Sequence, residues 1–184
     1  NRIPMSATYF LVDTLFNLYL MVVILRLWLQ FVRADFYNPF SQFVVKATQP
    51  IIAPLRRIIP SMGKFDTATF VLALMVACAK VAIISVFFSN SVFNPVAVII
   101  LGAMTLLKEF LSLIFWMLIL RAILSWVSQG GNPFEYVLSQ LTEPMLAPIR
   151  KVIPPMGGLD LSVLIAIIAL QFIQLLLTDF LGPF

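Results

Sequence analysis

Residues 49–63 read QPIIAPLRRIIPSMG, and residues 143–157 read EPMLAPIRKVIPPMG. Each stretch carries two adjacent cations between its prolines, which are Arg56 and Arg57 in the first and Arg150 and Lys151 in the second. Proline lacks a backbone N–H and disfavours helical conformation in the residue before it. The near identity of the two stretches predicts a duplicated architecture in which each copy redirects the chain.

The composition is that of an integral membrane protein. Of the 184 residues, 61% are hydrophobic and 11% are charged, and the mean hydropathy is +1.04, far from the balance of a soluble domain. Segments of the roughly 20 apolar residues that a spanning helix needs occur four times, at residues 6–32, 67–89, 100–127 and 161–180. The first apolar segment, residues 6–32, is longer than the hydrophobic core of a signal peptide, so it is expected to be a transmembrane helix. We therefore expect an all-α protein with four transmembrane helices.

A single offset of 94 residues aligns the two halves of the chain. It matches Asn38-Pro39-Phe40 with Asn132-Pro133-Phe134, and it matches ten further positions between Thr48 and Asp66. An offset of 95 also aligns Arg26 with Arg121. These matches predict two tandem units, residues 1–93 and 94–184, each built as helix, amphipathic interfacial elbow and helix. Because each unit crosses the membrane twice, the two copies are expected to be parallel repeats.

The elbows are residues 33–66 and 128–160. The pair Asn38-Pro39 predicts a helix start, with asparagine as the cap and proline at the first helical position. Pro50 and Pro54 make one continuous helix improbable, so a bend is expected. Asp66 and Asp160 are predicted to cap the spans that follow. Broken backbone cannot face lipid at depth, which predicts that each elbow lies in the headgroup interface, with its cations near phosphate.

The distribution of cations predicts the orientation. The turn at residues 90–95 has no cation, whereas the opposite side carries most of them: Arg33, Lys46, Arg56, Arg57, Lys64, Arg150 and Lys151. The positive-inside rule therefore predicts cytoplasmic elbows, with both termini outside.

Charged and polar residues within the spans predict a polar layer. Its members are Asp13, Lys80, Lys108, Glu109 and Gln174. Lys80 is expected to pair with Asp13 or Glu109, because an unpaired ammonium there would be costly. Two interpretations stay open, namely polar contacts that hold helices together and a relay for protons or cations.

Arg26 and Arg121 lie near the cytoplasmic ends of their spans. There the side chain can reach phosphate or bind an elbow carbonyl, and the duplication predicts that each arginine clamps its elbow. The small residues Gly102, Ala73 and Ala77, together with Ser85, are expected to allow close helix contacts.

Enzyme chemistry finds little support in the sequence. Histidine is absent and Cys78 is the single cysteine, so the usual nucleophile pairs and metal ligands are missing. Glycine-rich nucleotide motifs and haem-attachment motifs are also missing. We expect no catalytic residue, no metal and no cofactor. The cations are dispersed along apolar segments, so no nucleic-acid partner is expected either.

The duplicated pattern Asn-Pro-Phe followed by Pro-x-x-x-Pro-[LI]-Arg-[RK]-[IV]-Ile-Pro-x-Met-Gly-x-[FL]-Asp resembles the YggT (YlmG) family of bacterial and plastid membrane proteins. The resemblance covers nearly the whole chain. It implies a bacterial inner-membrane protein with family links to osmotic tolerance, cell division and cytochrome biogenesis, and it implies no enzymatic activity.

The expected function is that of a non-enzymatic scaffold or assembly factor. In this reading Arg56, Arg57, Arg150 and Lys151 form a basic platform for anionic lipid head groups or a partner membrane protein. The main alternative is an oligomeric channel or carrier subunit for a small ion or osmolyte, with the polar layer lining water. A weaker alternative is a factor that contacts an apocytochrome during maturation.

Overall fold

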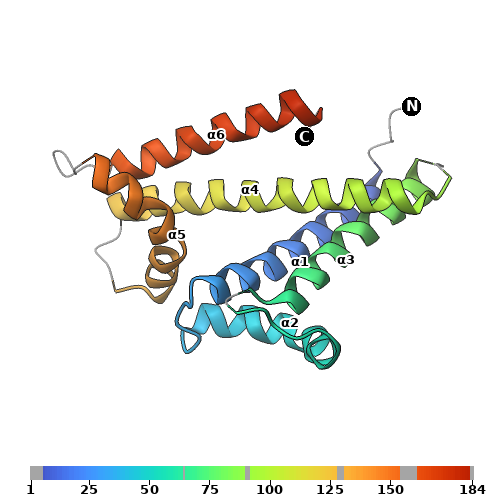
Figure 1. Ribbon diagram of the computed structural model, residues 1–184, viewed down its shortest axis with the longest axis horizontal. Coiled ribbons are helices and arrows are strands. Elements are labelled where there is room, and N and C mark those ends of the chain that lie inside the picture. Colours follow the sequence, from blue (N-terminus) through green and yellow to red (C-terminus); the bar gives the residue numbers. More distant parts are fainter. Residues whose placement is uncertain (1–5, 64, 90–91, 128–130, 154–160, 183–184) are drawn as a thin grey trace.

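The protein is all-helical in the computed structural model, which describes residues 6–63, 65–89, 92–127, 131–153 and 161–182 (Figure 1). Within these ranges the helical elements are α1 (Ala7–Phe31), α2 (Pro39–Ile58), α3 (Thr67–Ile83), the π-helical turn η1 (Ile84–Phe88), α4 (Pro95–Val127), α5 (Pro133–Val152) and α6 (Leu161–Leu181). Four segments are long and apolar enough to cross a membrane, namely α1, α3 with η1, α4 and α6. The expected class and the four expected spans are confirmed at this level.

Helix α4 begins at Pro95, earlier than the residue near 100 expected from hydropathy. The Oδ1 atom of Asn94 accepts from the backbone N of Val96 at 3.1 Å, and Pro95 takes the first helical position. This is the same asparagine-proline start signal that begins α2 and α5. With 33 residues, α4 is about 50 Å long at 1.5 Å per residue, which exceeds the roughly 30 Å of a hydrocarbon core.

The expected break at the elbow prolines is wrong. Helix α2 continues through Pro50 and Pro54, and α5 continues through Pro144 and Pro148. All four prolines are exposed. A proline removes the bond to the carbonyl four residues earlier, which lies on the same face of the helix. The freed carbonyls therefore lie on the outer face, where water or head groups can bind them, and the helix persists.

The predicted helix caps are confirmed where the structure describes them. Asn38 and Asn132 accept from the backbone N of the residue two positions on, and Asp66 accepts from the backbone N of Thr69. Asp160, the expected cap of α6, lies outside the described residues, as does Lys64.

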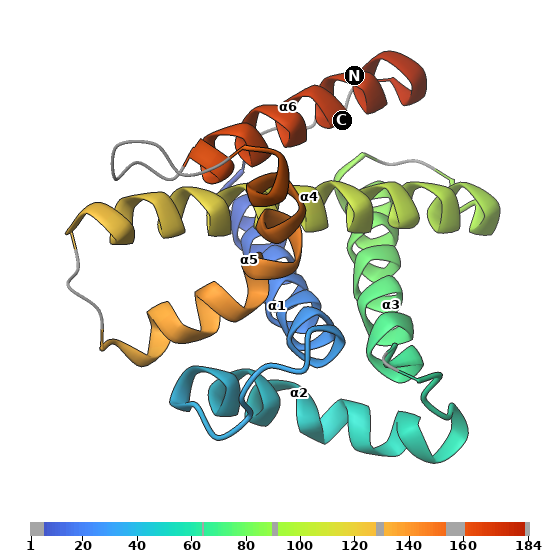
Figure 2. The same ribbon diagram turned by 60° about the vertical axis from the view of Figure 1, so that its left-hand side comes forward.

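The helices pack as two connected groups. Figures 1 and 2 show α1 and α3 side by side and crossing α4 obliquely, while α6 lies along α4. Helix α2 contacts α1 and α3, and α5 contacts α4 and α6. The N-terminal ends of α2 and α5 meet, because the rings of Phe40 and Phe134 lie 5.1 Å apart and Asn38 Nδ2 donates to Pro133 O at 2.8 Å. A single buried apolar cluster joins both groups; it includes Leu20, Leu29, Ile52, Leu113, Leu138 and Leu146.

Helices α3 and α4 approach closely at Gly102. A Cβ atom at this position would lie 2.5 Å from Cys78 Sγ and 3.1 Å from the Cα and N atoms of Cys78. Ala73 and Ala77 are fully buried in α3, while Ser85 lies half-buried in η1. The predicted close approach is therefore confirmed at Gly102. Ala73 and Ala77 are buried, as small residues at a helix contact would be. In a membrane such contacts replace the hydrophobic driving force between helices.

Substitution Gly102→Ala is expected to destabilise the protein despite a gain in helix propensity of about 1 kcal/mol. Overpacking against the Cys78 backbone costs about 1–3 kcal/mol, so the thermal unfolding midpoint in detergent should fall. Adding Cys78→Ala removes the Sγ contact and should restore part of the loss, with Cys78→Ala alone as the control. A Gly102→Ala midpoint at or above that of the wild type would contradict the close contact.

Candidate functional site

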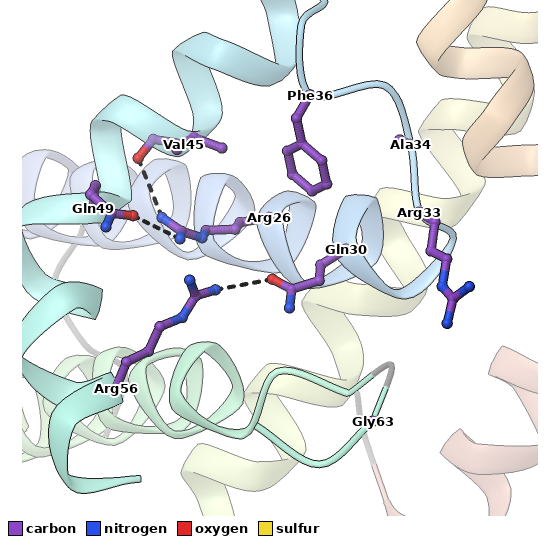
Figure 3. A pocket seen from close by; sticks show the side chains of 9 residues that line it. All are labelled: Arg26, Gln30, Arg33, Ala34, Phe36, Val45, Gln49, Arg56 and Gly63. Atoms are coloured by element: carbon purple, nitrogen blue, oxygen red, sulfur yellow. Dashed lines mark hydrogen bonds between the residues drawn. The ribbon is translucent and has the colours of Figure 1, made fainter. Parts of the chain in front are cut away.

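A buried arginine joins α1 to α2. Arg26 is 3% exposed, and its Nη1 donates to Thr48 Oγ1 at 2.8 Å and to Val45 O at 3.3 Å. Its Nη2 donates to Gln49 Oε1 at 2.8 Å (Figure 3). The Thr48 hydroxyl in turn donates to Val44 O at 2.9 Å, which leaves its oxygen free to accept from Arg26. One guanidinium thus holds a full turn of α2 just before Pro50.

The corresponding arginine joins α4 to α5. Arg121 Nη1 donates to Thr142 Oγ1 and to Ser139 O, the latter at 3.5 Å, and Nη2 contacts Glu143 Oε2 at 3.2 Å. The Thr142 hydroxyl donates to Leu138 O at 2.8 Å. Each partner lies 94 residues after its counterpart in α2. The two junctions therefore use the same atoms, apart from one exchange of an amide for a carboxylate.

The sequence pointed to Arg26 and Arg121 but missed their partners. Thr48 and Thr142 are identical at the offset of 94, and both are fully buried. A threonine retained two residues before each first proline was the available signal. The pair Gln49 and Glu143 was overlooked because it differs between the halves, although that difference changes the charge of the site.

Glu143 contacts both arginines of the second junction. Its Oε2 lies 3.2 Å from Arg121 Nη2, and its Oε1 lies 2.6 Å from Arg150 Nη1. At the first junction Gln49 carries no charge, and Arg56 instead contacts Asp66 at 2.5 Å and Gln30 at 3.1 Å. No carboxylate among the described residues makes an ion pair with Arg26.

An open cavity of about 730 Å³ lies beside the first junction. Figure 3 shows Arg26 and Gln49 on one side, Arg56 and Gln30 next to them, and Arg33 beyond Gln30. None of the described residues that line this cavity is a carboxylate. Its side chains are therefore mainly cations and amides, the groups that bind phosphate and carboxylate anions.

The four cations expected to form one platform lie in two separate places. Arg56 and Arg150 are part-buried in their ion pairs, whereas Arg57 and Lys151 are exposed. Helices α2 and α5 meet at their N-terminal ends, and their C-terminal ends lie apart in both views (Figures 1 and 2). Each elbow therefore presents its own basic end.

Asp66 fixes the start of α3 to the end of α2. Its side chain is fully buried and accepts from Arg56 Nη2 and from Thr69 Oγ1, each at 2.5 Å. Burial by itself raises the pKa of the Asp66 carboxyl, but the hydrogen bonds and charge of Arg56, together with Thr69, outweigh it. The pKa of Asp66 consequently lies below its usual value.

The intramembrane polar residues are only partly brought together. Lys80 Nζ lies 3.0 Å from Asp13 Oδ1, one of the two partners expected, and donates to Asn17 Oδ1 at 2.7 Å. Asn17 was not anticipated. The side chains of three further members make no hydrogen bond or ion pair with the described residues: Lys108, Glu109 and Gln174. The observed cluster links α1 to α3.

Comparison with known proteins identifies similar sequences. The family described as CCB3/YggT matches residues 5–87 and 100–181. A protein of Vibrio alginolyticus, named as an uncharacterized protein in the proC 3′ region, is 57% identical over 180 residues, which is 97% of this chain and 97% of the relative.

Two further relatives carry family names. Uncharacterized protein YggT of Escherichia coli (strain K12) is 48% identical over 171 residues, covering 93% of this chain and 89% of the relative. YlmG homolog protein 2, chloroplastic, of Arabidopsis thaliana is 38% identical over 65 residues, covering 35% of this chain and 26% of the relative. No solved structure matches the chain.

Substitution Arg26→Leu should release α2 from α1. Hydrogen bonds from a charged donor contribute about 1.5–3 kcal/mol, so amide hydrogen exchange in α2 should speed up roughly 10- to 100-fold. Arg121→Leu should have the same effect on α5 and leave α2 protected. Arg57→Leu makes the same chemical change at an exposed position of α2 and serves as the control. Unchanged protection of α2 in Arg26→Leu would count against the clamp.

Acid should weaken the α2–α3 junction through Asp66. A carboxyl with a lowered pKa stabilises the fold above its unfolded pKa of about 3.9, and this contribution is lost as the pH falls through the folded pKa. The variant Asp66→Asn keeps a good helix cap but loses the ion pair. Thermal melts of both proteins between pH 7 and pH 3 should show a stability difference at neutral pH that shrinks below about pH 4. A pH-independent difference would assign the effect to packing alone.

Proposed function

The chain belongs to the CCB3/YggT family, and from this premise we propose that it is a non-enzymatic scaffold or assembly factor of the bacterial inner membrane. In this proposal, α2 and α5 lie in the cytoplasmic headgroup interface. There they contact anionic lipid or a partner membrane protein. Both chain termini then face outside.

The observation that carries the proposal is the pair of arginine clamps. Each clamp holds a proline-containing helix against the end of a spanning helix, through Arg26 in the first half and Arg121 in the second. Each held helix ends in two cations, and one of each pair is exposed, namely Arg57 and Lys151. Exposed cations at the cytoplasmic surface attract anionic lipid at about 1 kcal/mol each. A fixed basic helix end is suited to binding, whereas catalysis would need reactive groups that the sequence lacks.

The two halves are proposed to be parallel repeats related by a pseudo-twofold axis. Equivalent residues contact each other where such an axis passes, and the rings of Phe40 and Phe134 are equivalent and in contact. The separate matches of the family to residues 5–87 and 100–181 support the same division.

The alternative function is an oligomeric channel or carrier subunit. It rests on the polar cluster of Lys80, Asp13 and Asn17, in which Asp13 retains 32% side-chain exposure. If these side chains only hold α1 and α3 together, the reconstituted protein should show no ion flux. A flux that disappears in Lys80→Met would favour the channel over the scaffold.

The scaffold proposal predicts enrichment of anionic lipid around the protein. Lipid nanodiscs of phosphatidylcholine with one fifth phosphatidylglycerol (about 20%), analysed by native mass spectrometry, should show more phosphatidylglycerol near the wild type than near Arg57→Ala/Lys151→Ala, because each lost cation removes about 1 kcal/mol of attraction. The charge-retaining variant Arg57→Lys/Lys151→Arg is the matched control. Equal enrichment in all three proteins would refute the lipid part of the proposal. A protein partner lost only from the alanine variant would identify what the elbows hold.

A further inference from the structure

We propose that the cavity at the α1–α2 junction is a binding site for one phosphate group. The cavity is lined by Arg26, Arg33 and Arg56, with the amides of Gln30 and Gln49. The inference rests on the proposed function, since it names the site and the head-group chemistry that would be recognised.

The first argument is that Arg26 makes no ion pair with a carboxylate of the described residues. Arg26 is 3% exposed, and it donates hydrogen bonds to three neutral acceptors, on Thr48, Val45 and Gln49. Removing a cation from water is costly unless an anion or further hydrogen bonds compensate it. Asp66 is committed to Arg56 and does not line the cavity. An anion in the cavity would supply the missing negative charge.

The second argument is a set of unused donors. Every hydrogen bond that Arg56 makes with a described residue starts from Nη2. Its Nε is buried without a partner, and Figure 3 shows the remaining end of its guanidinium directed toward the side of Arg26. Arginine presents its donors as a planar fork that fits two oxygens of a phosphate. The cavity thus offers the Nη1 group of Arg56, which makes no hydrogen bond with a described residue.

The third argument is the backbone of Arg33. Helix α1 ends in a Schellman motif, in which Ala34 N bonds to Leu29 O at 2.9 Å and Arg33 N bonds to Gln30 O at 3.2 Å. Arg33 occupies the left-handed position of this motif, with φ of 55°. Glycine is the usual residue there, because a side chain makes the conformation costly. Retaining an arginine at this position places a third guanidinium at the rim of the cavity.

The fourth argument comes from the other half of the chain. Glu143 occupies the position of Gln49, and its carboxylate receives both Arg121 and Arg150. The offset that aligns Arg26 with Arg121 also places Ser125 opposite Gln30. The second junction therefore contains a built-in anion where the first has a neutral amide. One anion at this position can therefore contact both guanidinium groups.

The surroundings favour a lipid as the source of the phosphate. Phe36 lines the cavity and is 40% exposed, and two nearby segments expose Phe31 and Ile58. A basic cavity with exposed apolar side chains around it suits an amphiphile, whose acyl chains cover the apolar groups. Free phosphate or a soluble phosphate ester shares the head-group chemistry but gains nothing from these apolar groups.

The decisive variant is Gln49→Glu, which copies the second junction into the first. It is expected to fold, because a glutamate already occupies the equivalent position of α5, at Glu143. In maltoside detergent, delipidated wild type titrated with phosphatidylglycerol should retain one lipid in native mass spectra. Gln49→Glu should weaken this binding at least about tenfold, since it places a like charge beside the phosphate. Gln42→Glu, an exposed position of the same helix, makes the identical change and should stay within about twofold.

One further variant separates binding from folding. Arg33→Gly should raise the thermal midpoint by relieving the left-handed position, yet weaken lipid binding about two- to fivefold. A purely structural role for Arg33 would not move stability and affinity in opposite directions.

The outcomes discriminate among the possible ligands and between the two proposals. Inorganic phosphate that binds the wild type, and loses affinity in Gln49→Glu, would keep the anion site and overturn its assignment to lipid. Equal binding of phosphatidylglycerol by wild type, Gln49→Glu and Gln42→Glu would overturn the site. If that result accompanies reduced enrichment in Arg57→Ala/Lys151→Ala, the elbow function stands without the cavity. If Gln49→Glu weakens phosphatidylglycerol binding while Arg57→Ala/Lys151→Ala leaves lipid enrichment unchanged, the cavity site stands and the proposed role of the exposed elbow cations is refuted.

Discussion

The structure depends on a guanidinium that reaches from the end of a spanning helix into the side of the next helix. Arg26 binds a hydroxyl, a carbonyl and an amide of α2 at once, and Arg121 repeats the arrangement in α5 with a carboxylate in place of the amide. A lysine could not span these acceptors, since its donors radiate from one point. Apolar contact alone would leave each proline-containing helix free to slide along its neighbour. The arginine gives each helix a fixed register against its span.

The prolines and the arginines act on opposite faces of the same helix. Pro50 and Pro54 leave carbonyls unpaired on the outer face of α2, where water or head groups can satisfy them. The opposite face carries Thr48 and Ile52, which are fully buried. The helix is therefore dry on one side and hydrated on the other. That division places its end, with Arg56 and Arg57, at the boundary between the bundle and its surroundings.

The two junctions use matching arginines and threonines, but Gln49 in the first stands where Glu143 stands in the second. Glu143 holds Arg121 and Arg150 together, whereas Gln49 leaves Arg26 without a carboxylate partner and Arg56 drawn to Asp66. Arg26 therefore lies beside an open cavity with neutral acceptors as its hydrogen-bond partners.

The sequence by itself determined the class, the four spans, the helix starts at Asn38 and Asn132, and the close approach at Gly102. These follow from local rules, since hydropathy, capping and the absence of a side chain act over a few residues. Continuity through Pro50 and Pro54 escaped prediction because it depends on which face of the helix is exposed. Local sequence also could not choose between Asp13 and Glu109 as the partner of Lys80. Only the tertiary structure decided that Thr48 and Gln49 meet Arg26, and that Arg33 shares a cavity with Arg56, because such contacts depend on how distant helices pack.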